Sequence, residues 1–208
     1  HTKSITVCLR LMRQIAMTVN MGRGTTMICQ MMENEGIPVY YSDSRAKQLM
    51  NQNESLMRSI KDRFGEESYH DGLLNRKWIA SIVFDDATAL NDLNNLVHPV
   101  VQKDYLNWVS QQTKDIVAYE SAILIEHGNQ GNFDAVILVQ CPENIRFERI
   151  QKRDGLTLAE VKARSRFQWP EEEKIKYADH LIENTTLEQA KQQLSSVISS
   201  IRKQLQKD

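Results

Sequence analysis

Short apolar runs separated by amphipathic stretches organise this chain. The runs at 15–19, at 116–119 continuing towards 125, and at 135–140 carry almost no polar positions. Strands of a parallel sheet are covered on both faces and read as such continuous apolar segments. Residues 39–41 and 180–183 form two shorter runs of the same kind. The pattern therefore predicts five buried strands.

Helical periodicity fills the intervals between these runs. It predicts helices over 27–35, 87–97, 100–112, 145–152 and 186–203. Strands alternating with helices indicate βαβ units, and therefore an α/β fold with a parallel sheet flanked by helices. Residues 44–98 contain no convincing strand and predict a mostly helical insertion that forms a second lobe. Residues 5–9 are an alternative first strand, at the expense of an overlong connection to Gly22.

Composition and charge exclude several classes of function. The 208 residues are 41% hydrophobic and 25% charged. Their net charge of -1 gives the protein as a whole no positive electrostatic field that would attract nucleic acid. No apolar run approaches the roughly 18 residues of a membrane span, and the N-terminal segment lacks the pattern of a signal peptide. Cys8, Cys29 and Cys141 have no metal-like spacing and predict reduced thiols in a cytoplasmic protein.

The stretch from Gly24 to Asp43 carries the clearest chemical signal. Gly24, Thr25 and Thr26 form a glycine turn that opens a helix, and a second strand follows and ends near Asp43. A helix N-terminus binds phosphate groups, and a carboxylate after the next strand stands where an acceptor hydroxyl arrives. The layout is typical of nucleotide kinases.

The ordered set of motifs from Gly22 onward resembles the dephospho-CoA kinase family, a group of P-loop kinases of the nucleoside-monophosphate-kinase type. The resemblance implies a single P-loop kinase-like unit over 1–208, with a helical acceptor-binding insertion at 44–100 and a helical lid at 146–170. The marks are Gly36-Ile37-Pro38-Val39 leading to Asp43, Ser44-Arg45-Ala46-Lys47, Phe64-Gly65, Leu74-Asn75-Arg76, Leu93-Asn94, His98-Pro99, Glu120 to Gly128, Arg149, Arg153-Asp154, Arg164, Gln168, Ala178-Asp179 and Asn184.

The phosphate loop itself departs from the family pattern. The resemblance places Thr26 at the Mg²⁺-binding hydroxyl, Thr25 at the lysine, and Gly24 and Gly22 at glycines. Val19 and Asn20 fall where the family has two further glycines, and Arg23 where it has a small residue. A β-branched valine resists the positive φ that a glycine position requires.

Three interpretations of the missing lysine remain open. The N-terminal sequence of a true kinase is altered or misassigned, or the enzyme is divergent and Arg23 supplies the cation, or the protein is a non-catalytic nucleotide- or coenzyme A-binding relative. Taken alone, the segment from Gly22 to Thr26 also fits an ordinary turn and helix start in which a threonine is the cap.

On the acceptor side the resemblance assigns catalysis to Asp43, which accepts the proton of the ribose 3′-hydroxyl. The alternative role of Asp43 is the N-cap of the helix that begins at Ser44. Arg45 and Lys47 are candidates for substrate phosphates, or are simply solvated on their helix.

Arg76, His98 and Glu120 complete the predicted acceptor site. His98 precedes a proline, which predicts an extended or turn conformation, and it is either a structural histidine or a border of the acceptor pocket. Glu120 is a carboxylate within an apolar strand and either faces the site or pairs with a buried basic residue.

The basic run from Arg146 to Arg166 is either a solvated helix face or a lid that contacts the triphosphate. Arg149 and Arg153 are four residues apart and share a helix face. The prediction assigns Arg149 and Arg153 to catalysis and Arg149 and Arg164 to the nucleotide. Asn184 matches a family position near adenine, with a turn residue or helix cap as the alternative.

Together these residues predict a cytoplasmic enzyme that phosphorylates the ribose 3′-hydroxyl of dephospho-CoA, the last step of coenzyme A biosynthesis. ATP with Mg²⁺ is the expected co-substrate, and a monomer or small homo-oligomer the expected assembly. No nucleic acid or membrane partner is expected. The rivals are another small-molecule kinase of this fold, which an acceptor screen separates, and the non-catalytic binding relative.

Overall fold

The computed structural model describes residues 12–19, 24–84, 86–155, 157, 160–161 and 168–205. It divides into two compact units, one holding residues 1–40 and 112–208 and the other residues 41–111. The alternative first strand at 5–9 lies outside the described residues.

The first unit is built on a five-stranded sheet with the order β2-β5-β1-β6-β7. The strands are β1 Arg13–Val19, β2 Val39–Tyr41, β5 Ile116–Glu120, β6 Ala135–Gln140 and β7 His180–Glu183. β1 is the middle strand and pairs in parallel with β5 on one side and β6 on the other, and β7 continues beyond β6. The predicted parallel sheet and its five strands are confirmed.

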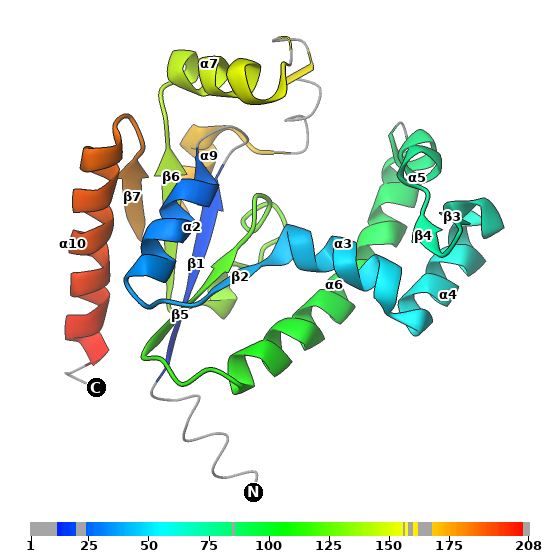
Figure 1. Cartoon of the computed structure of the whole chain (residues 1–208), viewed down its shortest axis with the longest axis horizontal. Coiled ribbons are helices and arrows are strands. Elements are labelled where there is room, and N and C mark those ends of the chain that lie inside the picture. The colour runs from blue at the N-terminus through cyan, green and yellow to red at the C-terminus, as the bar shows by residue number, and fades with distance from the viewer. Residues whose placement is uncertain are drawn as a thin grey trace, which may run out of the picture. The chain divides into compact units, whose positions relative to one another are not determined.

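Helices flank this sheet, as Figure 1 shows for α10 along β7. They are α2 Thr25–Asn34, α7 Glu143–Asp154, α9 Glu171–Ile175 and α10 Leu187–Leu205, with a 3₁₀ turn, η2, at Gln130–Asn132. α10 packs against β7 and α2, and α9 lies against β6. Ile15, Ala16 and Met17 of β1 are completely buried, because the sheet is covered on both faces.

The second unit is helical apart from one small hairpin. It contains α3 Ser42–Gln52, α4 Glu54–Phe64, the 3₁₀ turn η1 Glu66–Ser68, β3 Tyr69–His70, β4 Leu73–Leu74, α5 Arg76–Val83 and α6 Ala87–Ser110. Side-chain caps begin three of these helices: Asn53, Asn75 and Asp86 each accept a backbone N–H of the first turn. The expectation of no strand in this segment was wrong, because β3 and β4 pair as an antiparallel hairpin.

Three further expectations were wrong. The two helices predicted on either side of His98-Pro99 are a single helix, α6, with Pro99 inside it. His98 is therefore helical rather than extended, because the buried face formed by Val97, Val101 and Tyr105 outweighs the missing proline N–H. The third strand does not continue towards residue 125: β5 ends at Glu120 and turns follow.

Candidate functional site

A pocket of ≈ 680 Å³ lies at the carboxyl ends of β6 and β7. In open α/β sheets ligands bind outside this edge. Four of its lining side chains are carboxylates and one is a guanidinium, which suits hydroxyl and amino donors better than a triphosphate. The lining residues are Gln140, Cys141, Pro142, Glu143, Arg146, Gln168, Trp169, Pro170, Glu171, Glu172, Glu183 and Thr185.

Gly24 opens α2 in a left-handed conformation, with φ of 80°. A β-carbon at this position would lie 2.4 Å from Nδ2 of Asn184 and 3.7 Å from Nη1 of Arg149, so only glycine fits. The amides of Met27 and Ile28 donate to the carbonyl of Gly24, which leaves the first two amides of α2 with no intrahelical carbonyl to bond, and a glycine N-cap offers them no side-chain oxygen. The N-terminus of α2, a type of helix end at which negative charge is favoured, therefore lies beside Asn184 and Arg149.

Val19, which the resemblance places at a glycine of the phosphate loop, is the last residue of β1. It is buried, and among the described residues only Asp71 has a positive φ without being glycine. The conflict between a β-branched side chain and a left-handed turn therefore does not arise at Val19. The conformational demand for glycine falls on Gly24.

Arg149 reaches from α7 to the end of β7. Its Nη1 donates to the carbonyl of Asn184 at 2.9 Å and its Nη2 to that of Thr185 at 3.3 Å, while Nη1 also lies 3.5 Å from Sγ of Cys141. Asn184 is completely buried, and its N–H donates to the carbonyl of Gln140 at 2.8 Å. Arg149 and Asn184 thus form one cluster beside Gly24.

Asp43 is the second residue of α3, immediately after β2, and its side chain is exposed. The surrounding protein still removes enough water to raise the pKa of Asp43 above its ordinary value, and the positive charge of Lys47 opposes that rise. A raised pKa suits a carboxylate that takes a proton from a substrate. The N-cap of α3 is Tyr41, so Asp43 does not occupy the cap position considered from the sequence.

Arg45 is engaged within its own unit. Its Nε and Nη2 hold both carboxylate oxygens of Asp104 on α6, at 2.9 and 2.6 Å, and its Nη1 bonds Gln48 at 2.9 Å. This two-pronged pair joins α3 to α6. Arg45 is predicted to bind substrate phosphates, and in this structure its guanidinium serves the packing of two helices.

The remaining acceptor candidates lie apart along the chain. Arg76 is exposed at the start of α5, and His98 is half-buried on α6. Glu120 is half-buried at the last position of β5, opposite Met17 of β1, rather than inside an apolar strand as expected.

Several predicted nucleotide residues are described in part or not at all. Gly22, Arg23 and Arg164 lie outside the described residues. The backbones of Thr25 and Arg153 are described, but their side chains are not. Thr26 is exposed in the first turn of α2.

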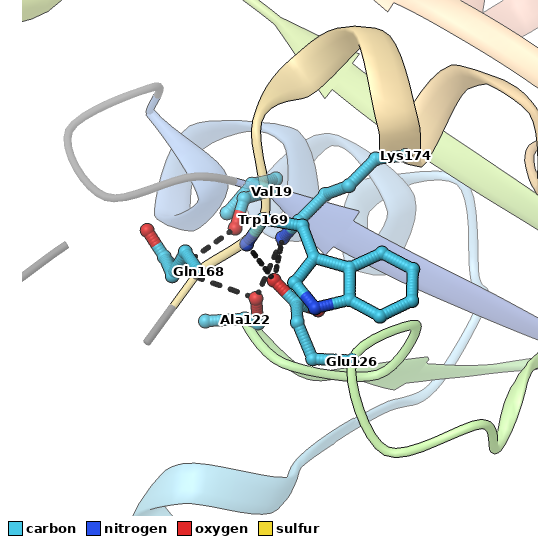
Figure 2. A network of polar contacts seen from close by, with 6 residues as sticks. All are labelled: Val19, Ala122, Glu126, Gln168, Trp169 and Lys174. Carbon is cyan, nitrogen blue, oxygen red and sulfur yellow. Dashed lines mark hydrogen bonds and ion pairs between the residues drawn. The ribbon is translucent and has the colours of Figure 1, made fainter. Parts of the chain in front are cut away.

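A network missed by the sequence analysis adjoins the pocket. Lys174 of α9 is completely buried and forms a 2.7 Å ion pair with Glu126, as Figure 2 shows. Lys174 follows three glutamates, and these charged neighbours in the sequence give no sign that it is buried.

The described residues contain no group of three or more His, Cys, Asp or Glu side chains arranged to hold a metal ion. Cys29 and Cys141 are buried and take part in no disulfide among the described residues, and Cys8 lies outside the described part. Within that part, no helix is both long and apolar enough to cross a membrane.

Comparison with solved structures identifies the fold. A Thermus thermophilus protein is 31% identical and superposes with a TM-score of 0.80, over 91% of this chain and 97% of its own. A dephospho-CoA kinase from Campylobacter jejuni, 24% identical, gives 0.59 over 92% and 98%. A shikimate kinase from Bacteroides thetaiotaomicron gives 0.52 at 13% identity, a likeness of fold alone. The core is that of P-loop kinases.

Comparison of sequences identifies the family. The dephospho-CoA kinase family model matches residues 13–189. A dephospho-CoA kinase from Porphyromonas gingivalis is 34% identical over 189 residues, 90% of this chain and 94% of its own. One from Thermus thermophilus is 32% identical over 188 residues, 90% and 91% of the two chains. This chain therefore belongs to the dephospho-CoA kinase family.

Proposed function

We propose that this protein transfers the γ-phosphate of Mg²⁺-ATP to the ribose 3′-hydroxyl of dephospho-CoA, completing coenzyme A. The observation that carries the proposal is Gly24, which opens α2 against Asn184 and Arg149 at the carboxyl edge of the sheet. Family membership supports the reaction, and this arrangement supports where its donor binds.

The adenosine part of ATP would occupy the pocket between the ends of β6 and β7. Its polar lining contains the donors and acceptors that a base and a ribose require, and Asn184 stands between this pocket and Gly24. The triphosphate would then run towards the first turn of α2, where main-chain N–H groups and the helix dipole favour negative charge. Gly22, Arg23, Arg153 and Arg164 remain predicted contacts of the same triphosphate.

Thr26 fits the role of Mg²⁺ ligand, because its hydroxyl is exposed in the first turn of α2. Mg²⁺ usually keeps several waters and is held by one or two protein groups together with substrate phosphates. A single hydroxyl and the absence of a carboxylate cluster in the described residues are compatible with that mode. When bound, the ion would supply positive charge to the phosphate oxygens.

Asp43 would orient the acceptor hydroxyl and take its proton. Because burial raises its pKa, the carboxylate holds a proton more readily than an ordinary aspartate, which strengthens it as a base. Lys47, Arg76, His98 and Glu120 remain the predicted acceptor contacts, with Arg45 acting through the Asp104 pair. The assignment of 44–100 to acceptor binding and of 146–170 to a lid is part of the proposal.

The identity of residue 25, a threonine, gives a specific reason to consider a second candidate function. A threonine at the lysine position removes a point charge from the β- and γ-phosphates. The second candidate is therefore a family member that binds nucleotide or coenzyme A precursor without turning it over. Turnover and binding must be measured side by side to separate the two.

The decisive experiment measures ADP formation from Mg²⁺-ATP with and without dephospho-CoA. We expect acceptor-dependent turnover in the parent and a loss of about 10²–10⁴-fold in Asp43→Asn, with ATP affinity retained. Glu54→Gln is the matched control, an acidic residue in the first turn of the neighbouring helix α4. Binding without turnover would support the second candidate. Faster turnover with nucleoside monophosphates would contradict the acceptor, and an active Asp43→Asn would contradict the base.

The proposed partners are the two small-molecule substrates, with neither nucleic acid nor membrane. The proposed assembly is a monomer or small homo-oligomer in the cytoplasm.

A further inference from the structure

A buried ion pair ties α9 to the turns that follow β5. Nζ of Lys174 lies 2.7 Å from Oε1 of Glu126, and the two side chains are 0% and 6% exposed. Nζ also donates to the carbonyl of Ala122 at 3.1 Å. Charges this deep are costly to desolvate unless their partners are well placed.

The same carboxylate fixes the backbone just before α9. Oε1 of Glu126 accepts the N–H of Trp169 at 2.9 Å. Figure 2 shows this N–H and the Lys174 ammonium converging on Glu126. Gln168, Trp169 and Pro170 all line the pocket at the ends of β6 and β7. Glu126 therefore sets the position of one wall of that pocket.

Gln168 carries the connection to β1. Its Nε2 donates to the carbonyl of Ala122 at 3.3 Å and, in a longer and weaker bond, to that of Val19 at 3.5 Å. Val19 is the last residue of β1, and five residues later Gly24 opens α2. The Ala122 carbonyl accepts from both Gln168 and Lys174. This one oxygen therefore links the ion pair, through Gln168, to Val19 at the end of β1.

Stability alone is a weak explanation for this pair. Replacing a buried ion pair with apolar side chains of similar size is often neutral or stabilising. Moreover, Oε2 of Glu126 is buried and has no hydrogen-bond partner within the described part of the chain. An incompletely satisfied charge is a poor way to stabilise a core. The Glu126 carboxylate does, however, fix the direction of the two donors that it accepts, the N–H of Trp169 and the ammonium of Lys174.

We propose that Glu126 and Lys174 are positioning residues for phosphoryl transfer. They hold Gln168 between Ala122 and Val19, and so align the pocket wall with the carboxyl end of β1. The inference rests on the proposed site for ATP. A small displacement of the donor phosphate would slow transfer without altering how the acceptor binds.

The test compares Lys174→Met, Glu126→Gln, their double variant and Gln168→Met with the parent. Lys176→Met is the matched control, because Lys176 forms an ion pair of the same 2.7 Å length with Glu173, two residues further along and exposed. Thermal unfolding, kcat, the KM of each substrate and the Kd of Mg²⁺-ATP are measured for each.

Each single change in the pair takes the opposite charge away from a buried charge and should lower Tm. The double variant should recover most of that Tm while its kcat stays about 10–100-fold below the parent. Gln168→Met should lower kcat similarly at parental Tm, with the KM for dephospho-CoA changed less than about threefold. Adding Gln168→Met to the double variant should lower kcat little further, because all three act on one connection.

A double variant with parental Tm and parental kcat would overturn the proposal, as would a Gln168→Met variant with unchanged kinetics. If the parent transfers no phosphate to dephospho-CoA, the proposed function fails and ATP affinity decides the inference separately. The Kd should then rise about tenfold in Gln168→Met and in the double variant, but not in Lys176→Met. Equal affinity in all of them would refute it.

Discussion

Nη1 of Arg149 donates a 2.9 Å hydrogen bond to the main-chain carbonyl of Asn184, one residue after β7 ends. An arginine expected to contact the triphosphate is thus also part of the scaffold that presents Asn184 to Gly24. A substitution of Arg149 is therefore expected to affect both the contact with the triphosphate and the position of Asn184.

Arg149→Lys should lower both stability and turnover. An ammonium cannot hold the carbonyls of Asn184 and Thr185 with the same planar fork, so we expect a loss of about 1–3 kcal/mol in the free energy of unfolding. Turnover should fall about 10–100-fold as Asn184 moves. Chemical denaturation and kinetics check this, with Lys152→Met on the same helix as control. A kinetic loss at unchanged stability would mean that Arg149 contacts only the substrate.

Gly24→Ala should abolish ATP binding, whereas Gly36→Ala should not. Both glycines have positive φ, 80° and 78°, so alanine costs each about 1–2 kcal/mol in backbone strain. Only at Gly24 would the new β-carbon collide with Asn184, and at Gly36 nothing lies within 4 Å. Calorimetric titration with Mg²⁺-ATP, alongside denaturation, separates strain from collision. Equal ATP affinity in the two variants would contradict the proposed location of the phosphates.

Thr25→Lys should raise turnover. Thr25 is the first residue of α2 and holds the position of the phosphate-loop lysine. A cation there would neutralise charge that develops during transfer, and we expect a gain of about 10²–10³-fold if no other group supplies it. Thr25→Met provides the side-chain length without the charge. An unchanged rate in Thr25→Lys would indicate that another cation, with Arg23 the first candidate, already does this.

Lys47→Met should move the acidic limb of the kcat profile to higher pH. Asp43 must be ionised to accept a proton, and the Lys47 charge lowers the pKa of Asp43 against the larger effect of burial. Removing the charge therefore raises that pKa further, and Lys47→Arg should leave the limb in place. Rates at saturating substrate across the acidic range test this. A limb that does not move would dissociate Asp43 from the proton transfer.

Asp43→Asn should be more stable than the parent at neutral pH. The folded-state pKa of Asp43 is raised, so the folded protein binds this proton more tightly than the unfolded chain does. The stability that this tighter proton binding contributes is therefore lost as pH rises through the interval between the unfolded-state and folded-state pKa values of Asp43. Asparagine has no proton to lose in this pH range, so Asp43→Asn removes that loss of stability. Tm measured at neutral and acidic pH should show a gain in Asp43→Asn that disappears at low pH.

The inner strands β1 and β6 were readable from the sequence because burial on both faces leaves an apolar run, whereas in the edge strand β7 only Ile182 is buried. Residues 39–41, 135–140 and 180–183 were placed with the bounds that the structure has. Pro99 misled the assignment of helices, since the local rule that proline ends a helix gave way to the packing of α6 on α3, α4 and α5. The hairpin of β3 and β4 was missed because two-residue strands have no periodicity to detect.

Three residues of the predicted nucleotide site lie together in the structure, but their contacts were not readable from the sequence. Gly24, Arg149 and Asn184 were selected from spacing and resemblance, and the structure brings them together. Their partners were not readable, because Arg149 bonds main-chain carbonyls 35 and 36 residues away, which carry no side-chain signature. The pairing of Arg45 with Asp104, which lies 59 residues on, was not readable for the same reason. Tertiary pairing of charges leaves little trace in a single sequence.

The complete burial of Lys174 makes it a natural reporter. Amine-directed acylation requires a neutral nitrogen that a reagent can reach, and the exposed Lys176 satisfies the second condition while Lys174 does not. Modification of Lys174 would therefore occur only when α9 separates from the turns around Glu126. The ratio of Lys174 labelling to Lys176 labelling would therefore measure how fast this part of the pocket opens, and the exposed Lys176 is the internal reference.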